Sequence, residues 1–276
     1  MVRGVAAPFV LALAIAAVGR SRNSPAAWLV AALGLAALAG WLWLEGFPSL
    51  PPPSAKAKLP YLVAAALGLG LLGDSRWARG GALAIAGASV AAALVWIAWR
   101  PLQAGAEGGM LLSMGGVAAG TLIFFEGTRR AAARDGALGA AIPLVTGGAG
   151  MGGVALLGAS ATLGLFSGSV AAAAGGIATG LYAARLLGRD TRGGASLAWL
   201  GTAALAGIAG VLALFTPKVN VAALALLAFT PWSGETLREL ATGAGATARA
   251  FRPVLLTLGC ALPPLAAVGL AQLWES

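Results

Sequence analysis

Long apolar runs follow one another along almost the whole chain, with only short polar connections between them. An α-helix needs about 20 mainly apolar residues to cross the hydrocarbon core of a bilayer. Such runs recur throughout the 276-residue sequence, and they predict an all-α fold, a polytopic bundle of about ten transmembrane helices. The predicted segments are residues 4–19, 25–45, 59–73, 81–99, 108–126, 138–159, 163–187, 196–216, 219–234 and 253–273.

The overall composition favours the lipid bilayer as the surroundings of this chain. Hydrophobic residues make up 59% and charged residues 10% of the sequence, and the mean hydropathy is +0.88. Soluble domains carry about 25% charged residues. Nine acidic and eighteen basic side chains are too few to cover the surface of a soluble fold of this length. We therefore expect a multi-pass protein of the cytoplasmic (inner) membrane.

The basic residues are distributed unequally between alternate connections. If all ten segments cross, one side holds thirteen: Arg20, Arg22, Arg76, Arg79, Arg129, Arg130, Arg134, Arg185, Arg189, Arg192, Arg238, Arg249 and Arg252. The other side holds five: Arg3, Lys56, Lys58, Arg100 and Lys218. Because basic loops stay on the cytoplasmic side, this bias predicts that both termini are extracytoplasmic.

The short segment 219–234 is the least secure of the ten. If it did not cross, Arg238, Arg249 and Arg252 would change sides and the split would fall to ten against eight. The charge bias therefore favours a crossing, although whether these residues span the whole membrane is left open.

The chain is expected to form one integral membrane domain, residues 1–276. The proline-rich stretch Gly46 to Pro60 reads as a stiff surface loop. Five segments on each side of the boundary between 1–135 and 136–276 would give halves of opposite orientation, as in carriers with inverted repeats.

Several polar and aromatic residues are predicted to lie at helix ends. Glu126 is followed one turn later by Arg129 and Arg130, with which it can pair. Tryptophans prefer the membrane interface, and seven lie near predicted helix ends: Trp41, Trp43, Trp96, Trp99, Trp199, Trp232 and Trp274.

Glycines spaced four apart mark the centre of the sequence. They are Gly148 and Gly152, Gly164 and Gly168, and Gly176 and Gly180. Small residues at this spacing allow helices to approach closely. We expect either packing within the chain, or a seam against a partner subunit or a solute path.

Prolines and nearby polar groups mark candidate hinges or parts of a solute path. Pro263 and Pro264 lie in the middle of the last segment, where a missing N–H and ring clashes are expected to kink or break a helix. Pro143 with Thr146 is a second candidate, and Asn220 lies just inside the ninth segment.

The chemistry that would point to catalysis is missing from the sequence. There is no histidine and one cysteine, Cys260, and no paired acidic motif or phosphate-binding loop is found. The bases form no stripe with interleaved aromatic residues, so nucleic-acid binding is not expected despite the net charge of +9. We predict no enzyme activity, no cofactor and no metal.

Two functions remain open at this stage. The first is a non-catalytic membrane-embedded subunit or scaffold that binds other membrane protein subunits through glycine-rich faces. The alternative is a transporter of a small neutral or lipophilic solute, built as an inverted repeat of five helices.

Overall fold

The computed structural model describes residues 2–19, 25–72, 76–105, 107–158, 160–187, 194–240 and 246–275. Within these ranges the chain is helical and contains no strand, which confirms the predicted all-α class. The elements are α1 (Val2–Gly19), α2 (Pro25–Glu45), the 3-10 turn η1 (Lys56–Lys58), α3 (Leu59–Leu72), α4 (Arg76–Ile97), α5 (Trp99–Gln103), α6 (Gly108–Leu157), α7 (Ala161–Leu186), α8 (Gly194–Phe215), α9 (Val221–Leu227), α10 (Thr230–Leu240) and α11 (Ala246–Glu275).

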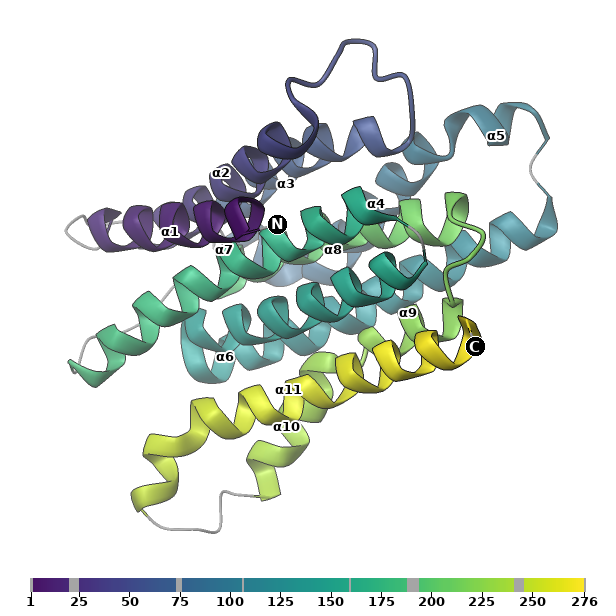
Figure 1. The fold of residues 1–276 in the computed structure, drawn as a ribbon. Helices are drawn as coiled ribbons and strands as arrows, with labels where there is room; N and C mark the ends of the chain where they lie inside the picture. The colour runs from purple at the N-terminus through teal and green to yellow at the C-terminus, as the bar shows by residue number, and fades with distance from the viewer. Residues whose placement is uncertain are drawn as a thin grey trace.

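Six helices in the described ranges are long and apolar enough to cross a membrane, as expected of a multi-pass membrane protein. They lie side by side as a bundle (Figure 1). The six stretches are Ala27–Glu45, Gly80–Ile97, Gly108–Leu157, Ala161–Leu186, Gly194–Phe215 and Pro253–Trp274. Val5–Ala17 in α1 is apolar but shorter.

Helix α6 is a hairpin of two helical arms. Gly136 breaks it with the dihedral angles φ 65° and ψ −150°. A Cβ at Gly147 would lie 2.8 Å from the ring of Phe124, although 23 positions along a straight helix would separate them by about 35 Å. The arms therefore run back along each other, and they correspond to the predicted segments 108–126 and 138–159.

The ninth predicted segment is divided between two short helices. α9 ends at Leu227 and α10 begins at Thr230. Pro231 falls in the first turn of α10, where the absent N–H of proline costs no helical hydrogen bond. Segment 219–234 is thus not a single helix: its second half belongs to a helix that continues to Leu240.

Different helix ends and turns lie at the two ends of the bundle. The Gly136 turn, the last turn of α7 and the end of α10 lie at one end, and α5 lies toward the other (Figure 1). At the α5 end, Arg100 Nη1 donates to the Pro53 carbonyl at 3.2 Å, so the proline-rich loop lies against α5.

The tryptophans differ in exposure. Trp43 and Trp274 are 63% and 73% exposed, but Trp41 and Trp199 are 2% and 6% exposed. Trp41 packs edge-on against Phe166, with 5.1 Å between the ring centres, and Trp199 packs against Phe125, with 4.9 Å between the ring centres. These two side chains therefore pack inside the bundle, and the predicted position of the tryptophans at the membrane interface stays a prediction. Trp41 and Trp43 are two positions apart on one helix and point to opposite sides, so only one of them can face outward.

Candidate functional site

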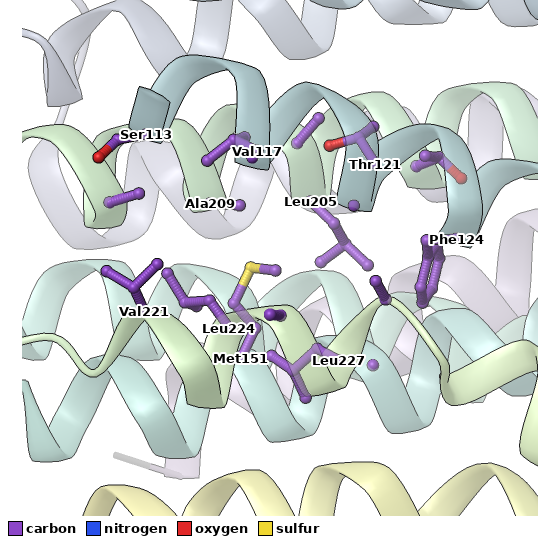
Figure 2. Close-up of a pocket in the computed structure, with 18 of the residues that line it drawn as sticks. Ser113, Val117, Thr121, Phe124, Met151, Leu205, Ala209, Val221, Leu224 and Leu227 are labelled. Carbon is purple, nitrogen blue, oxygen red and sulfur yellow. The ribbon is translucent and has the colours of Figure 1, made fainter. Parts of the chain in front are cut away.

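A cavity of about 310 Å³ lies between both arms of α6, α8 and α9. The first arm of α6 forms one wall with residues that include Val117 and Thr121, and α9 forms the facing wall with Val221 and Leu224 (Figure 2). The volume lies at the small end of the range for ligand sites. Among the described residues no charged side chain lines the cavity, so its interior suits an uncharged apolar molecule.

The cavity is closed near Phe124 and open along other parts of its wall. Leu112 and Val221 at one end are 79% and 54% exposed. Phe124, at the end away from Val221 in Figure 2, is 6% exposed, and Leu227 is 3% exposed. Gly116 and Ala225 in the cavity wall are exposed as well, so the opening is not confined to the end that carries Leu112 and Val221.

Glycines provide the open space along the first arm of α6. Gly116 lines the cavity, and a Cβ placed there would have no heavy atom within 4 Å. At Gly120 the nearest atom is the Ala228 Cβ at 3.6 Å. The neighbouring Gly115 is equally open but does not line the cavity. These glycines are not among those singled out from the sequence.

Three hydroxyl side chains line this otherwise apolar cavity. Ser113 Oγ donates to the Gly109 carbonyl at 3.0 Å, and Thr121 is 8% exposed. Thr202, on α8, is 4% exposed, and its Oγ1 has no hydrogen-bond partner among the described residues. A buried polar group without a partner costs about 1–3 kcal/mol. A hydrogen bond from a ligand to the Thr202 hydroxyl would remove this cost.

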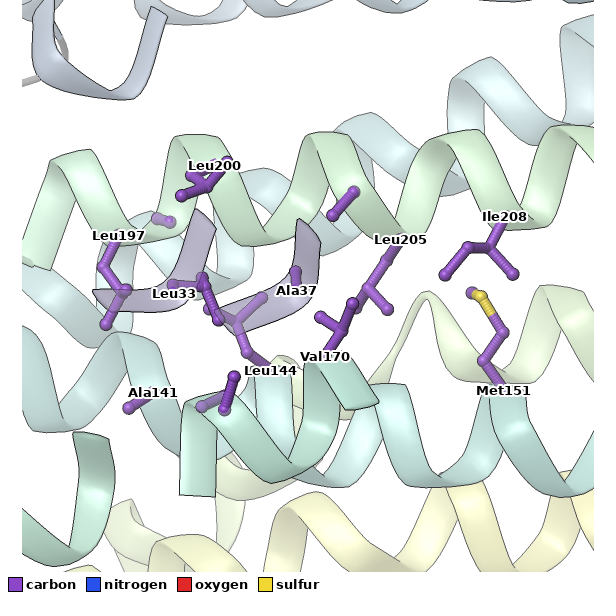
Figure 3. Close-up of a cluster of buried hydrophobic side chains, with 14 of the residues drawn as sticks. Leu33, Ala37, Ala141, Leu144, Met151, Val170, Leu197, Leu200, Leu205 and Ile208 are labelled. Carbon is purple, nitrogen blue, oxygen red and sulfur yellow. The ribbon is translucent and has the colours of Figure 1, made fainter. Parts of the chain in front are cut away.

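The cavity borders a tightly packed core. Met151 and Leu205 line the cavity in Figure 2 and also belong to the cluster of buried side chains in Figure 3. In that cluster, Leu33 of α2 lies near Leu144 of the second α6 arm and Leu200 of α8. The second arm of α6 and α8 therefore contribute side chains both to the core and to the cavity wall. The first arm of α6 and α9 form the remaining walls of the cavity.

An ion-pair cluster joins three helices at the end of the bundle that carries the Gly136 turn. It consists of Arg134 and Asp135 on α6, Arg185 on α7, and Glu235, Arg238 and Glu239 on α10. Arg238 Nη1 donates to Asp135 Oδ2 at 2.8 Å, and Arg238 Nη2 lies 3.2 Å from Glu235 Oε2. Asp135 also lies 3.8 Å from Arg185, and Arg134 pairs with both Glu235 and Glu239.

The centre of this cluster is largely shielded from the surroundings. The side chains of Asp135, Glu235 and Arg238 are only 9%, 9% and 11% exposed. Glu235 Oε1 and Arg238 Nε are buried and have no hydrogen-bond partner among the described residues. The cluster therefore joins the α6 turn to α7 and α10 through ion pairs. Each buried charge in it is neutralised only by its partners in the cluster.

Glu126 forms a separate ion pair within the first arm of α6. It accepts hydrogen bonds from Arg129 Nε and Arg130 Nε at 2.8 Å each. The pairing predicted from the spacing of these residues is confirmed.

At the other end, Lys58 binds the carboxyl end of α4. Its Nζ donates to the Trp96 carbonyl at 2.6 Å, and this cation lies 5.7 Å from the centre of the Trp96 ring. Carbonyl groups at a helix end attract cations. Burial, together with the nearby Arg100 charge, lowers the pKa of Lys58 from its usual value. This contact joins the loop before α3 to α4.

The predicted glycine pairs lie in two seams within the chain. At the α6–α7 seam, a Cβ at Gly148 would lie 3.1 Å from the Ala171 Cβ, and one at Gly152 would lie 3.1 Å from the Gly164 carbonyl oxygen and 3.6 Å from Gly168 N. Gly176 and Gly180 face α1 instead: Gly176 lies against the Phe9 backbone, and a Cβ at Gly180 would lie 3.3 Å from Leu13.

The predicted hinge residues lie in regular helical surroundings. Thr146 Oγ1 donates to the Ile142 carbonyl at 3.1 Å, next to Pro143 in the second α6 arm. The Asn220 side chain caps α9 by accepting from Ala223 N at 3.1 Å. None of the eleven residues singled out from the sequence lines the cavity.

Helix α11 continues across Pro263 and Pro264, so the predicted break does not occur. Pro263 has no N–H to donate to the Gly259 carbonyl. Ser233 Oγ of α10 donates to this carbonyl instead, at 2.9 Å. Pro264 lies against Gly150, where a Cβ would be 3.0 Å from the proline Cα. Neighbouring helices thus satisfy the backbone and make room for the rings.

The described residues offer no group of three or more His, Cys, Asp or Glu side chains placed to hold a metal ion. The cavity wall, with its apolar surface and hydroxyls, is suited to binding an uncharged molecule. Comparisons of the chain with protein-family models, with curated proteins and with solved structures found no match.

Proposed function

We propose that this protein is a non-catalytic carrier that binds a small, uncharged lipophilic molecule in the cavity between α6, α8 and α9. The observation that carries this proposal is a cavity of about 310 Å³ with mainly apolar walls and no charged side chain among the described residues that line it. An interior of this kind accepts apolar molecules without desolvating a charge. The proposal does not depend on an inverted repeat of five helices.

Filling the cavity tests this proposal. Gly116→Leu places a side chain in open cavity space and should reduce the affinity for tritiated 1-decanol at least tenfold, equivalent to about 1.4 kcal/mol. The measurement is equilibrium binding to the purified full-length protein in detergent. Gly115→Leu adds the same side chain next to the cavity, in equally open space, and should bind like the unmodified protein. Equal binding by all three proteins would refute the carrier proposal.

We also propose that the chain crosses the cytoplasmic membrane about ten times, with both termini extracytoplasmic. The two arms of α6, the apolar α1 and α3, and the tandem of α9 and α10 would supply crossings beyond the six long helices. The thirteen-to-five distribution of basic residues supports the orientation.

Cysteine labelling tests the orientation in intact cells. Lys56→Cys and Arg130→Cys would each be made in a Cys260→Ala background, because the native Cys260 is the only cysteine. Both positions are accessible, with side chains 46% and 52% exposed. A membrane-impermeant maleimide should label Lys56→Cys in intact cells and Arg130→Cys only after permeabilisation. Labelling of both from the same side would contradict the proposed topology.

A second function, a subunit of a larger membrane complex, is favoured by the outer face of the first α6 arm. Gly108, Gly109 and Gly115 are exposed, and a Cβ at any of them would have no heavy atom within 4 Å. Small residues on an exposed membrane helix allow a partner helix to approach closely. Purification in mild detergent followed by mass spectrometry should then recover a partner that Gly115→Leu displaces. A lone protomer would count against this function.

A further inference from the structure

Two buried threonines in the described helices, Thr202 and Thr230, leave their hydroxyls unused, and of these two Thr202 lines the cavity. Thr128, Thr146, Thr179 and Thr257 each donate to the carbonyl four residues earlier, at 2.7 to 3.1 Å. Threonines in membrane helices make this bond readily. Thr202 lies within α8, so the same type of carbonyl is available to it. Its Oγ1 nevertheless has no partner in the part of the chain that the structure describes.

The position of Thr202 directs this unused hydroxyl toward a ligand. The residue is 4% exposed and lines the cavity, together with the buried Phe124 and Leu205. Thr121 is the other buried residue with a hydroxyl in the cavity wall. The cavity has room beside Thr202 for a ligand, so a polar atom of the ligand is a partner that the site offers for this hydroxyl.

We infer that the ligand is a neutral lipid-like molecule with one hydroxyl or carbonyl group, and that Thr202 holds this group at the closed end of the cavity. A threonine hydroxyl both donates and accepts, so it can pair with either group. The absence of charged side chains among the described lining residues excludes a phosphate or carboxylate at this depth. The apolar part of the ligand lies along Val117 and Leu224, away from the closed end. This inference rests on the proposed carrier function and identifies its substrate class.

The inference is tested by comparing two probes that differ only in a hydroxyl. Unlabelled 1-decanol and n-decane would each displace tritiated 1-decanol from the purified full-length protein, with the cavity-filled Gly116→Leu variant defining non-specific uptake. The unmodified protein should prefer 1-decanol over n-decane by about tenfold, the ratio that ~1.4 kcal/mol of hydrogen bonding produces. Thr202→Val should reduce this ratio about tenfold, toward equal binding.

Two further variants separate the hydrogen bond from effects on folding. Thr202→Ser keeps a hydroxyl and should retain the preference. Thr146→Val removes a hydroxyl that already bonds to the Ile142 carbonyl and does not line the cavity, so it should also retain the preference. An unchanged ratio in Thr202→Val would overturn the inference but leave the carrier function standing. Equal binding by Gly116→Leu and the unmodified protein would instead refute the carrier function itself.

Discussion

Replacement of Arg238 by methionine should lower the free energy of unfolding by about 3–5 kcal/mol, the usual cost of removing one partner from a buried ion pair. Arg238 contacts both Asp135 and Glu235, at 2.8 and 3.2 Å, and all three side chains are at most 11% exposed. Without the guanidinium, two carboxylates would stay buried. Their remaining partners, Arg134 and Arg185, are more exposed, at 44% and 37%.

Denaturant unfolding in a fixed detergent, followed by tryptophan fluorescence, measures this loss. Arg130→Met is the matched control, because Arg130 is 52% exposed and its partner Glu126 keeps Arg129. An exposed pair contributes about 0–1 kcal/mol, so the control should remain close to the unmodified protein. Equal stability of the Arg238→Met and Arg130→Met variants would show that the ion-pair cluster does not hold this end of the bundle together.

The segment pattern of the fold could be predicted from the sequence because hydrocarbon imposes a length on each helix. The arms of α6 follow the predicted segments 108–126 and 138–159, and Gly136 falls between them. The division of the ninth segment into α9 and α10 was harder to predict from the sequence. Pro231 marks the first turn of α10, but hydropathy alone does not separate one interrupted crossing from one continuous helix.

The ion-pair cluster could not be predicted because its members are far apart in sequence. Asp135 follows Arg134 and Glu235 lies three residues before Arg238. These positions at segment ends favour contact with water and lipid headgroups when each segment is considered alone. Only the packing of α10 against α6 brings Arg238 within 2.8 Å of Asp135. The one signal in the sequence was that acidic and basic residues occur together in the connections assigned to the side with thirteen basic residues.

The cavity was missed for a different physical reason. Glycines allow close packing where a neighbour fills the space, as at Gly148 and Gly152, and leave a cavity where none does, as at Gly116. The spacing of glycines along one helix does not show whether a neighbouring helix fills the space beside them. It therefore cannot distinguish a packed seam from a cavity. Thr202 was likewise indistinguishable in sequence from threonines whose hydroxyls bond to their own helix.

Replacement of Gly136 by alanine should lower the free energy of unfolding by about 1–3 kcal/mol, the cost of holding a residue with a Cβ in a backbone region that glycine alone adopts readily. Gly136 has φ 65° and ψ −150°, and this conformation reverses the chain between the arms of α6. Alanine favours a continuous helix here, which would separate Phe124 from Gly147 and pull Asp135 away from Arg238. The variant should therefore also weaken binding of 1-decanol, although Gly136 lies outside the cavity.

Gly109→Ala provides the control for this substitution. Gly109 lies within the first arm of α6, and a Cβ there has no heavy atom within 4 Å, so alanine should leave stability unchanged or raise it by up to about 1 kcal/mol through its helix propensity. Unfolding in the same detergent, together with 1-decanol binding, compares the two variants. A Gly136→Ala protein as stable as Gly109→Ala, with undiminished binding, would show that the hairpin does not need glycine at its turn, and that the positions of the arms around the cavity are set by the core and the ion-pair cluster alone.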